Sequence, residues 1–352
     1  MHNYFRDKNT MANLTINDIA RMANVSKTAV SFVLNGKEGV GEETRNRVLA
    51  VIEQTNYSPN VHTRRLNLKK SFTIYVVMHQ QEVSFANLFN MEIIFGILNK
   101  SKELGYSVVF ISISDEKDIG ILSGYVRNKD TDGIIFMQDP ENSILSIVED
   151  SSIPFLVVDS HAPDTVSYTQ VKVDYFIAAY EAVKYLIEKG HKKVAFIGME
   201  SQPDYYVNTF GGFNKALQEA NLPIMPTWIQ SEAKNEQSAY NCMQRIIDAH
   251  DLPTAVFCAG DIFAISAMKC VKENNLLVPG NISFVGLDDI VVSPYVDPPL
   301  TTMSINENQM GEESMQIIFD MINNNSYQNI NYTSSNIVER STVKDLTCTT
   351  FA

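Results

Sequence analysis

Residues Thr15–Gly36 read TINDIARMANVSKTAVSFVLNG, and they predict two short helices joined by a tight turn. Thr15 is a suitable N-cap with Asp18 three residues later, and the apolar residues that follow recur at helical spacing. Asn24 interrupts this spacing, and Ser26 supplies a second N-cap. Two helices joined so closely are typical of a helix-turn-helix, whose second helix enters the major groove of DNA by its N-terminal end.

Polar side chains gather at the start of the second expected helix. Lys27 can donate to guanine or to a phosphate, and the hydroxyls of Ser26, Thr28 and Ser31 can donate or accept. Phe32 stands beside them, and its ring can contact a thymine methyl group but cannot form a hydrogen bond. We therefore expect Lys27, Thr28 and Ser31 to be the main base-reading residues, with an apolar or weak preference opposite Phe32.

A third helix is expected over residues 42–54, with Val48, Leu49 and Ile52 turned inward. The pattern alone leaves open a generic three-helix bundle or a dimerisation cap. Charge favours DNA, because residues 1–70 hold 11 Lys and Arg against 6 Asp and Glu, whereas the remainder holds 17 against 35. A basic head on an acidic body indicates that only the head meets a polyanion.

The segment YSPNVHTRRLNLKKS, residues 57–71, connects this head to the rest of the chain. Pro59 can begin a helix, four basic residues follow it, and Leu66 has no obvious core to join. A short helix that forms on DNA, with Leu66 as a wedge in the minor groove, explains this combination. The alternative is a basic linker in which Leu66 packs on a neighbouring domain.

After residue 71 the pattern alternates between apolar strands and amphipathic helices, and this predicts two doubly wound parallel α/β units. Helices are expected over residues 88–104, 175–189 and 263–273, and another from about Gly211. Small ligands bind such sheets at the carboxyl ends of strands. The acidic candidates there are Asp159, Asp174, Asp261, Asp288 and Asp289, although any one of them could instead cap a loop or a helix.

This order of motifs resembles the LacI/GalR (lactose-repressor) family of bacterial transcription regulators. The resemblance rests on TINDIARMANVSKTAVSFVLNG and TRNRVLAVIEQTNYSPN in the head, and on GHKKVAFIG, AGDIFAISAM, VPGNISFVGLDD, PPLTTM and IVERST in the body. It implies an N-terminal all-α helix-turn-helix head with a hinge helix. It also implies a two-lobed α/β domain like periplasmic sugar-binding proteins, with parallel doubly wound sheets.

The expected domains follow from the resemblance. They are an N-terminal extension (1–13), the helix-turn-helix domain (14–58), the hinge helix or linker (59–70), an effector-binding and dimerisation domain (71–342), and a tail (343–352). Within the large domain, the first lobe would hold about 71–172 and 300–333, and the second about 173–299 and 334–342.

The resemblance also implies site residues. Those expected to contact DNA are Thr15, Ser26, Lys27, Thr28, Ser31, Phe32, Asn35, Tyr57, Asn60, Thr63, Arg64 and Leu66. Those expected to contact an effector are Asn87, Phe89, Asp174, Thr209, Gly260, Asp261 and Asp288.

Two effector positions depart from the family's pattern. Thr209 stands where the family commonly has an Arg, and Gly260 stands where it commonly has an Asn. Because an Arg fork and an Asn amide are groups that clamp sugar hydroxyls or phosphates, their loss disfavours a plain sugar. An amphipathic or larger ligand, or no ligand, is the alternative. The aromatic residues that could stack on an apolar ring are Tyr205, Tyr206, Trp228 and Phe263.

The expected partners are double-stranded operator DNA, a small-molecule effector and a second copy of the chain. We expect a homodimer rather than a tetramer, because the residues after 342 carry no heptad pattern. We expect neither a cofactor, a metal nor a membrane span, and the N-terminus lacks the features of a signal peptide, so we expect a cytoplasmic, nucleoid-associated bacterial protein.

Two other classes of protein fit this sequence less well. A solute-binding protein of transport is the alternative, and the basic head and the missing signal peptide oppose it. An enzyme would need a catalytic pair such as Asp288 and Asp289, but neighbouring residues on a strand point to opposite faces. The chain also lacks the GxSxG, P-loop and HExxH motifs.

Overall fold

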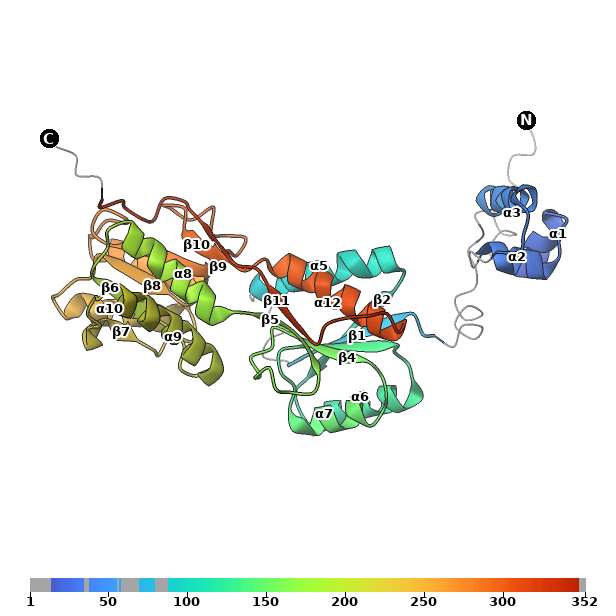
Figure 1. Cartoon of the computed structure of the whole chain (residues 1–352), viewed down its shortest axis with the longest axis horizontal. Coiled ribbons are helices and arrows are strands. Elements are labelled where there is room, and N and C mark those ends of the chain that lie inside the picture. Colours follow the sequence, from blue (N-terminus) through green and yellow to red (C-terminus); the bar gives the residue numbers. More distant parts are fainter. Residues whose placement is uncertain (1–13, 35–37, 56, 58–69, 80–87, 348–352) are drawn as a thin grey trace, which may run out of the picture. The chain divides into compact units, whose positions relative to one another are not determined.

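The computed structural model describes residues 14–34, 38–55, 57, 70–79 and 88–347. The chain divides into two compact units, residues 1–71 and residues 72–352. Each unit is described by itself below, and both are drawn in Figure 1.

The described residues of the N-terminal unit form three helices: α1 (Ile16–Met22), α2 (Lys27–Leu34) and α3 (Glu42–Thr55). Thr15 and Asp18 form a reciprocal capping box at the start of α1. Asn24 has a φ of 50°, so the turn between α1 and α2 uses a left-handed residue, which asparagine tolerates well. Ile19 of α1, Val30 of α2 and Val48 of α3 meet in one small core.

The inward face of α3 differs from the sequence expectation at Leu49. Val48 is fully buried and Ile52 packs against the core, as expected, but the side chain of Leu49 is 48% exposed. Residues 48, 52 and 55 are separated by one or two helical turns and share a face, whereas residue 49 lies about 100° away from residue 48.

Six parallel strands form the sheet of the first lobe, in the order β11-β5-β4-β3-β1-β2. The strands are β1 (Thr73–His79), β2 (Ser107–Ile113), β3 (Gly133–Met137), β4 (Phe155–Val158), β5 (Thr169–Val173) and β11 (Ile330–Thr333). In register, Thr73 of β1 lies opposite Ser107 of β2. Strand β2 is therefore an edge strand, and its outer side faces no other strand among the described residues.

Helices cover both faces of this sheet (Figure 1). Helices α5 (Leu88–Leu104) and α12 (Glu307–Ile322) pack with Ile74 and Val76 of β1. Helices α6 (Glu116–Asn128) and α7 (Asn142–Glu149) pack with Tyr75 and Val77. The alternation of β1 side chains between two cores is the pattern of a strand that is buried on both faces.

The second lobe repeats this plan with the strand order β12-β10-β9-β8-β6-β7. Its strands are β6 (Val194–Ile197), β7 (Ile229–Gln230), β8 (Ala255–Cys258), β9 (Ser283–Asp288), β10 (Thr301–Ser304) and β12 (Asn336–Val338). β12 runs antiparallel to β10, and the other pairs are parallel. Its helices are α8 (Tyr175–Glu188), α9 (Pro203–Glu219), α10 (Glu236–Asp248) and α11 (Asp261–Glu273), with a short 3₁₀ turn, η2 (Pro226–Trp228), before β7.

The chain passes between the lobes three times, after β5, after β10 and after β11. The sequence places the second passage near residue 300, but β10 (Thr301–Ser304) pairs with β9 of the second sheet, so the passage follows residue 304. Helix α9 also begins at Pro203 rather than near Gly211, since proline suits the first turn of a helix.

Among the described residues, no helix combines the length and apolar character required to cross a bilayer. The same residues contain no group of three or more His, Cys, Asp or Glu side chains arranged to hold a metal ion. The cysteines Cys242, Cys258 and Cys270 are buried and free.

Candidate functional site

The first turn of α2 presents polar side chains to solvent. Lys27 and Thr28 are exposed, and Ser31 is half-buried one turn further on. The Oγ atom of Ser26 accepts a hydrogen bond of 3.1 Å from the backbone N–H of Ala29, so Ser26 caps the helix as predicted. A serine hydroxyl that accepts this bond can also donate its proton to an outside acceptor.

Phe32 has a partner within the head. Its ring lies against Gly39, where an added Cβ atom would stand 3.4 Å from the Cε2 atom of Phe32. The half-buried ring therefore covers the segment that leads into α3, and only part of it faces outward. This contact gives Phe32 a packing role that the sequence did not indicate.

The remaining DNA candidates are placed as follows. Thr15 is exposed at the start of α1, and its hydroxyl donates to the Oδ2 atom of Asp18 at 2.7 Å. Tyr57 is half-buried against the head core, its backbone N–H donates to the carbonyl of Ile52, and burial raises the pKa of its phenol. Outside the described residues lie Asn35, Asn60, Thr63, Arg64 and Leu66, together with the effector candidate Asn87.

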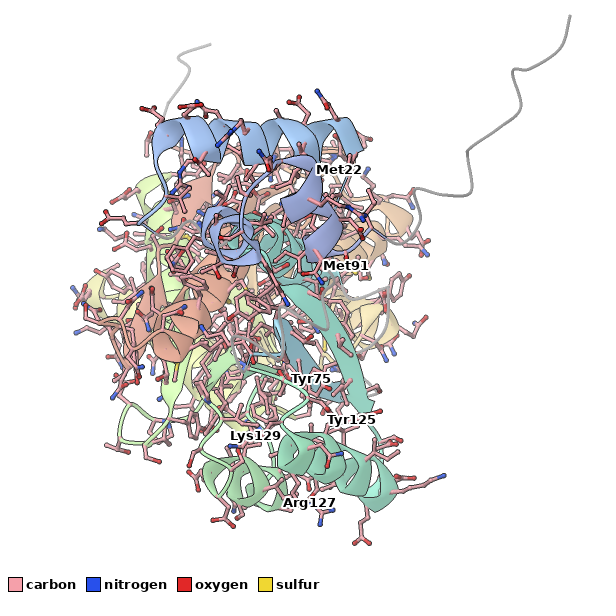
Figure 2. The ribbon with its side chains drawn as sticks, turned by 90° about the vertical axis from the view of Figure 1, so that its right-hand side faces the viewer. Met22, Tyr75, Met91, Tyr125, Arg127 and Lys129 are labelled. Carbon is pink, nitrogen blue, oxygen red and sulfur yellow. The ribbon has the colours of Figure 1, made fainter. Side chains whose placement is uncertain are left out.

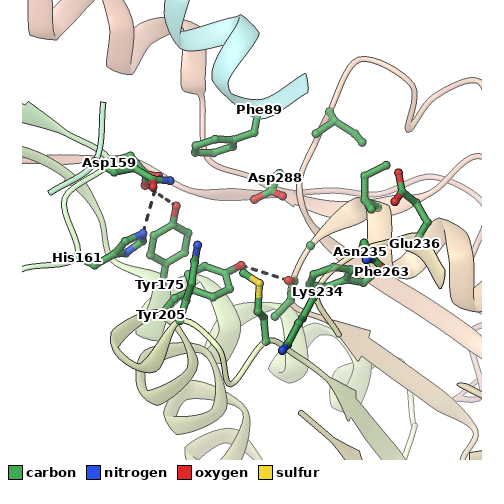
Figure 3. Close-up of a pocket in the computed structure, with 17 residues that line it drawn as sticks. Phe89, Asp159, His161, Tyr175, Tyr205, Lys234, Asn235, Glu236, Phe263 and Asp288 are labelled. Atoms are coloured by element: carbon green, nitrogen blue, oxygen red, sulfur yellow. Dashed lines mark hydrogen bonds and ion pairs between the residues drawn. The ribbon is translucent and has the colours of Figure 1, made fainter. Parts of the chain in front are cut away.

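A pocket with a volume of about 310 Å³ lies between the two lobes, at the carboxyl ends of their strands (Figure 3). The first lobe contributes Phe89, Gln138, Asp159 and His161. The second lobe contributes Tyr175, Met199, Gln202, Tyr205, Lys234, Asn235, Glu236, Ala259, Gly260, Ile262, Phe263, Asp288 and Ile290. The effector candidates Phe89, Gly260 and Asp288 are thus brought together, as doubly wound sheets predict.

Asp159 anchors the wall of the first lobe. It follows β4, and its Oδ1 atom accepts a hydrogen bond of 2.8 Å from the hydroxyl of Tyr175, which belongs to the second lobe. Gln138 donates to Oδ2 at 3.4 Å, and the Nε2 atom of His161 lies 3.8 Å from the same oxygen. Burial raises the pKa of Asp159, because the charged form loses its hydration. The contact with Tyr175 joins the two lobes inside the pocket (Figure 3).

Asp288 occupies the wall of the second lobe. It ends β9 with a φ of 120°, a conformation that costs a residue with a side chain roughly 1–3 kcal/mol and is typical of functional sites. Burial raises its pKa, and the nearby carboxylates of Asp261 and Glu307 act in the same direction. Asp289 turns away from the pocket and pairs with Arg340 at 2.6 Å, so the two neighbouring acids diverge, as the sequence predicts.

Aromatic rings form much of the remaining wall. Tyr175 and Tyr205 meet edge to face with ring centroids 4.7 Å apart, and the His161 ring lies 5.4 Å from that of Tyr175. Phe89 and Phe263 complete the aromatic lining from opposite lobes (Figure 3).

Two of the four aromatic residues expected to stack on a ligand do not line the pocket. Trp228 is buried in the second lobe, where its Nε1 atom donates to the carbonyl of Asp251 at 2.7 Å. Tyr206 stacks on Phe210 with centroids 5.5 Å apart.

Three effector candidates lie outside the pocket. Thr209 is fully buried in α9, where its hydroxyl donates to the carbonyl of Tyr205 at 2.9 Å. Asp174 caps α8 by accepting from the N–H of Ile177. Asp261 is fully buried beneath the pocket wall. We therefore place Thr209, Asp174 and Asp261 outside the site.

The sequence reasoning missed Gln138, His161 and Tyr175. Gln138 and His161 follow the ends of β3 and β4 by one and three residues, so extending the strand-end rule to uncharged residues would have found them. Tyr175 opens α8 in an apolar run, and nothing in the sequence separates it from a core residue.

The chain combines a helix-turn-helix unit, which is a DNA-binding motif, with two α/β lobes around a ligand-sized cleft. These are the parts of a ligand-responsive DNA-binding regulator. The bacterial regulatory protein lacI family matches residues 15–60, and the periplasmic binding protein-like domain matches residues 183–343. Curated transcriptional repressors are 32–33% identical to this chain over 88–93% of its length, and together with the family match they show that the chain belongs to the lacI family. It is a transcriptional repressor with an effector-binding domain, and not an enzyme.

Its curated relatives include the HTH-type transcriptional repressor PurR of Histophilus somni (strain 2336), which is 33% identical over 311 residues, 88% of this chain and 92% of the relative. PurR of Haemophilus influenzae (strain PittEE) is 32% identical over 336 residues, 93% of this chain and 98% of the relative. The solved Lac repressor dimer bound to operator and the anti-inducer ONPF matches with a TM-score of 0.73 and 24% identity, over 94% of this chain and 99% of that one. The transcriptional regulator CelR–cellobiose complex matches with a TM-score of 0.69 and 23% identity, over 94% and 100%. These two structures share the fold.

Proposed function

We propose that this repressor binds operator DNA as a homodimer and that a small effector in the pocket between the lobes controls its affinity for the operator. The observation that carries the proposal is the exposed first turn of α2, with Lys27, Thr28 and the capping residue Ser26 at its surface. A helix that presents such groups at its N-terminus fits the major groove. The protein would act in the cytoplasm, on the nucleoid.

An apolar surface on the first lobe supports the dimer. Phe95 and Leu98 of α5 are 47% and 38% exposed, and Val109 and Phe110 of the edge strand β2 are 42% and 43% exposed. Tyr125 of α6 extends this surface, 40% exposed and in edge contact with Tyr75 (Figure 2). Apolar side chains gathered near a sheet edge mark an interaction site. A second copy is the partner that two operator half-sites require.

The pocket supports control by an effector. Asp159 and Asp288 belong to different lobes, so a ligand that contacts both residues favours one arrangement of the lobes over another. Such a difference in affinity, typically worth about 1–3 kcal/mol, is the free energy that a ligand can transmit to the operator. A ligand that favours the arrangement with low operator affinity would be an inducer, and one that favours the arrangement with high affinity would be a co-repressor.

Genomic footprinting of the protein on its own chromosome would reveal the operator, and Lys27→Ala would then test the reading helix. We expect Lys27→Ala to weaken binding, and to lower the slope of log affinity against log salt by about 1 if Lys27 meets a phosphate. If it meets a base, discrimination at that base should fall by about 1–3 kcal/mol. Arg47→Ala removes an equal charge from α3 and serves as the control. Unchanged affinity and specificity in Lys27→Ala would remove Lys27 from the interface.

A further inference from the structure

The buried part of the pocket is acidic on both walls. Asp159 stands on the first lobe and Asp288 on the second, and the described lining residues include no arginine. Lys234 and Glu236, of opposite charge, are both exposed where they line the pocket. A cationic ligand would favour the ionised form of these acids, which burial disfavours, whereas an anionic ligand would oppose it.

The two carboxylates differ in their partners. Asp159 accepts from Tyr175 and Gln138, and the Nε2 atom of His161 lies 3.8 Å from its Oδ2 atom. Asp288 receives a hydrogen bond from the backbone N–H of Asp261, and no described side chain donates to it. Two further acids, Asp261 and Glu307, act in the same direction as burial and raise the pKa of Asp288. Asp288 is therefore a half-buried acid without a described cationic partner, and a cation from outside would stabilise its charged form.

Aromatic faces surround the same space. Phe89 comes from the first lobe, and Tyr205 and Phe263 come from the second (Figure 3). Tyr205 uses its hydroxyl to reach the carbonyl of Ala259 at 3.3 Å, which leaves its ring as the surface that a ligand would meet. Aromatic faces attract both apolar rings and cations. A volume of about 310 Å³ suits a molecule with one or two rings.

We infer that the effector is a small amphipathic amine, whose protonated nitrogen pairs with Asp288 and whose apolar or aromatic body lies among Phe89, Tyr205 and Phe263. This inference rests on the proposed function, because it names the ligand class of the proposed effector pocket. It excludes phosphorylated and carboxylated effectors, and it ranks neutral sugars below amines.

Three probes of nearly equal shape test the charge. Tyramine, tyrosol and 4-hydroxyphenylacetate carry the same phenol ring and end in an ammonium, a hydroxyl and a carboxylate. In calorimetric titrations of the full chain without DNA, we expect tyramine to bind at least about tenfold more tightly than tyrosol, and 4-hydroxyphenylacetate not to bind. Cellobiose is titrated in the same way as an example of a neutral sugar.

Two variants locate the charge recognition. Asp288→Asn keeps the size of the side chain and should remove the preference for tyramine over tyrosol. Asp248→Asn makes an identical change at an exposed position of α10 and should preserve that preference. Circular dichroism of both variants would show that each is folded before titration.

The inference is overturned if cellobiose, tyrosol or the carboxylate binds more tightly than tyramine. It is also overturned if neither tyramine nor the related amines phenethylamine and tryptamine bind, or if Asp288→Asn retains the preference for the amine. In each case operator binding can persist, so the proposed function survives. A chain that occupies no chromosomal site would refute the proposed function, and the calorimetry would still decide the ligand class because it uses no DNA.

Discussion

Asp261 joins three segments of the second lobe through one buried carboxylate. Its Oδ2 atom accepts from the N–H of Ile290 at 3.1 Å and from the hydroxyl of Ser293 at 2.5 Å, while Oδ1 accepts from the hydroxyl of Thr302 at 2.5 Å. Gly286 makes room for this arrangement, because a Cβ atom there would stand 2.0 Å from Oδ1 of Asp261. Asp261 therefore fixes the loop after β9, which positions Asp288 in the pocket.

Replacing Asp261 should destabilise the second lobe in a way that depends on the new side chain. Asp261→Ala leaves the buried N–H of Ile290 without an acceptor and should lower the free energy of unfolding by roughly 2–4 kcal/mol. Asp261→Asn keeps one oxygen acceptor, and the hydroxyls can rotate, so it should cost less. Denaturant unfolding followed by the fluorescence of Trp228, the single tryptophan, reports on this lobe. Equal stability of Asp261→Ala and wild type would contradict the bridging role.

The strand-end acids show what the sequence could and could not predict at this scale. The positions of Asp159, Asp174, Asp261 and Asp288 follow from the alternation of strands and helices. The direction of each side chain depends on local packing that one sequence does not reveal. Asp174 turned to its helix and Asp261 to the interior, whereas Asp159 and Asp288 face the pocket.

At the scale of elements, the close crossing of α5 and α12 supports the first lobe. A Cβ atom at Gly311 of α12 would stand 2.0 Å from the carbonyl oxygen of Ile93, and one at Gly96 of α5 would stand 2.0 Å from that of Asn308. The two backbones are therefore in direct contact. This crossing also places the first turn of α12, with Glu307, directly after the segment where the chain passes between the lobes, which follows Ser304.

Gly311→Ala should separate α5 from α12. The added methyl group meets rigid backbone, so we expect a loss of about 2 kcal/mol or more in the free energy of unfolding. Gly124→Ala in α6 is the matched control, because no atom lies within 4 Å of its added Cβ. That control should be neutral or stabilising by up to about 1 kcal/mol, since alanine favours helices. If both variants behave alike in chemical denaturation, the crossing is not as tight as the backbone distances indicate.

Element prediction succeeded where the periodicity was strong and local. The bounds expected for α5 match those observed, because its apolar spacing is continuous and Gly105 follows it closely. Helix α9 was expected to start late, because its first turns carry paired tyrosines that fit several patterns. The sheet to which β10 belongs was misassigned, because strand pairing between distant segments is set by the tertiary fold and not by local sequence.

At the scale of the whole molecule, the apolar surface on the first lobe predicts the state of association. Phe110→Glu places a charge in the middle of the proposed dimer interface, so we expect monomers and weaker operator binding. Tyr295→Glu is the control, because Tyr295 is 85% exposed on the second lobe, away from that surface. Sedimentation equilibrium would measure the molecular mass of both variants in solution and so distinguish monomers from dimers. A dimer that persists in Phe110→Glu would place the interface elsewhere.

Glu307 predicts how the stability of the molecule depends on pH. Its side chain is 6% exposed, its Oε1 atom has no described hydrogen-bond partner, and burial raises its pKa to about 8, with Asp261, Asp289 and Glu92 acting in the same direction. The folded chain therefore holds a proton that the unfolded chain releases above its ordinary pKa of 4.5. Stability attributable to this group is greatest below that value and is lost as the pH rises toward 8.

Glu307→Gln keeps the shape of the side chain and removes this titration. The variant should match wild type near pH 5 and exceed its free energy of unfolding by on the order of 2–4 kcal/mol above pH 8. Glu312→Gln removes an exposed carboxylate from the same helix and should leave the pH profile of wild type unchanged. Denaturant unfolding at a series of pH values, followed by circular dichroism, measures all three proteins. Parallel profiles for wild type and Glu307→Gln would mean that Glu307 has already lost its proton in the folded chain at neutral pH. The start of α12 would then hold a buried negative charge.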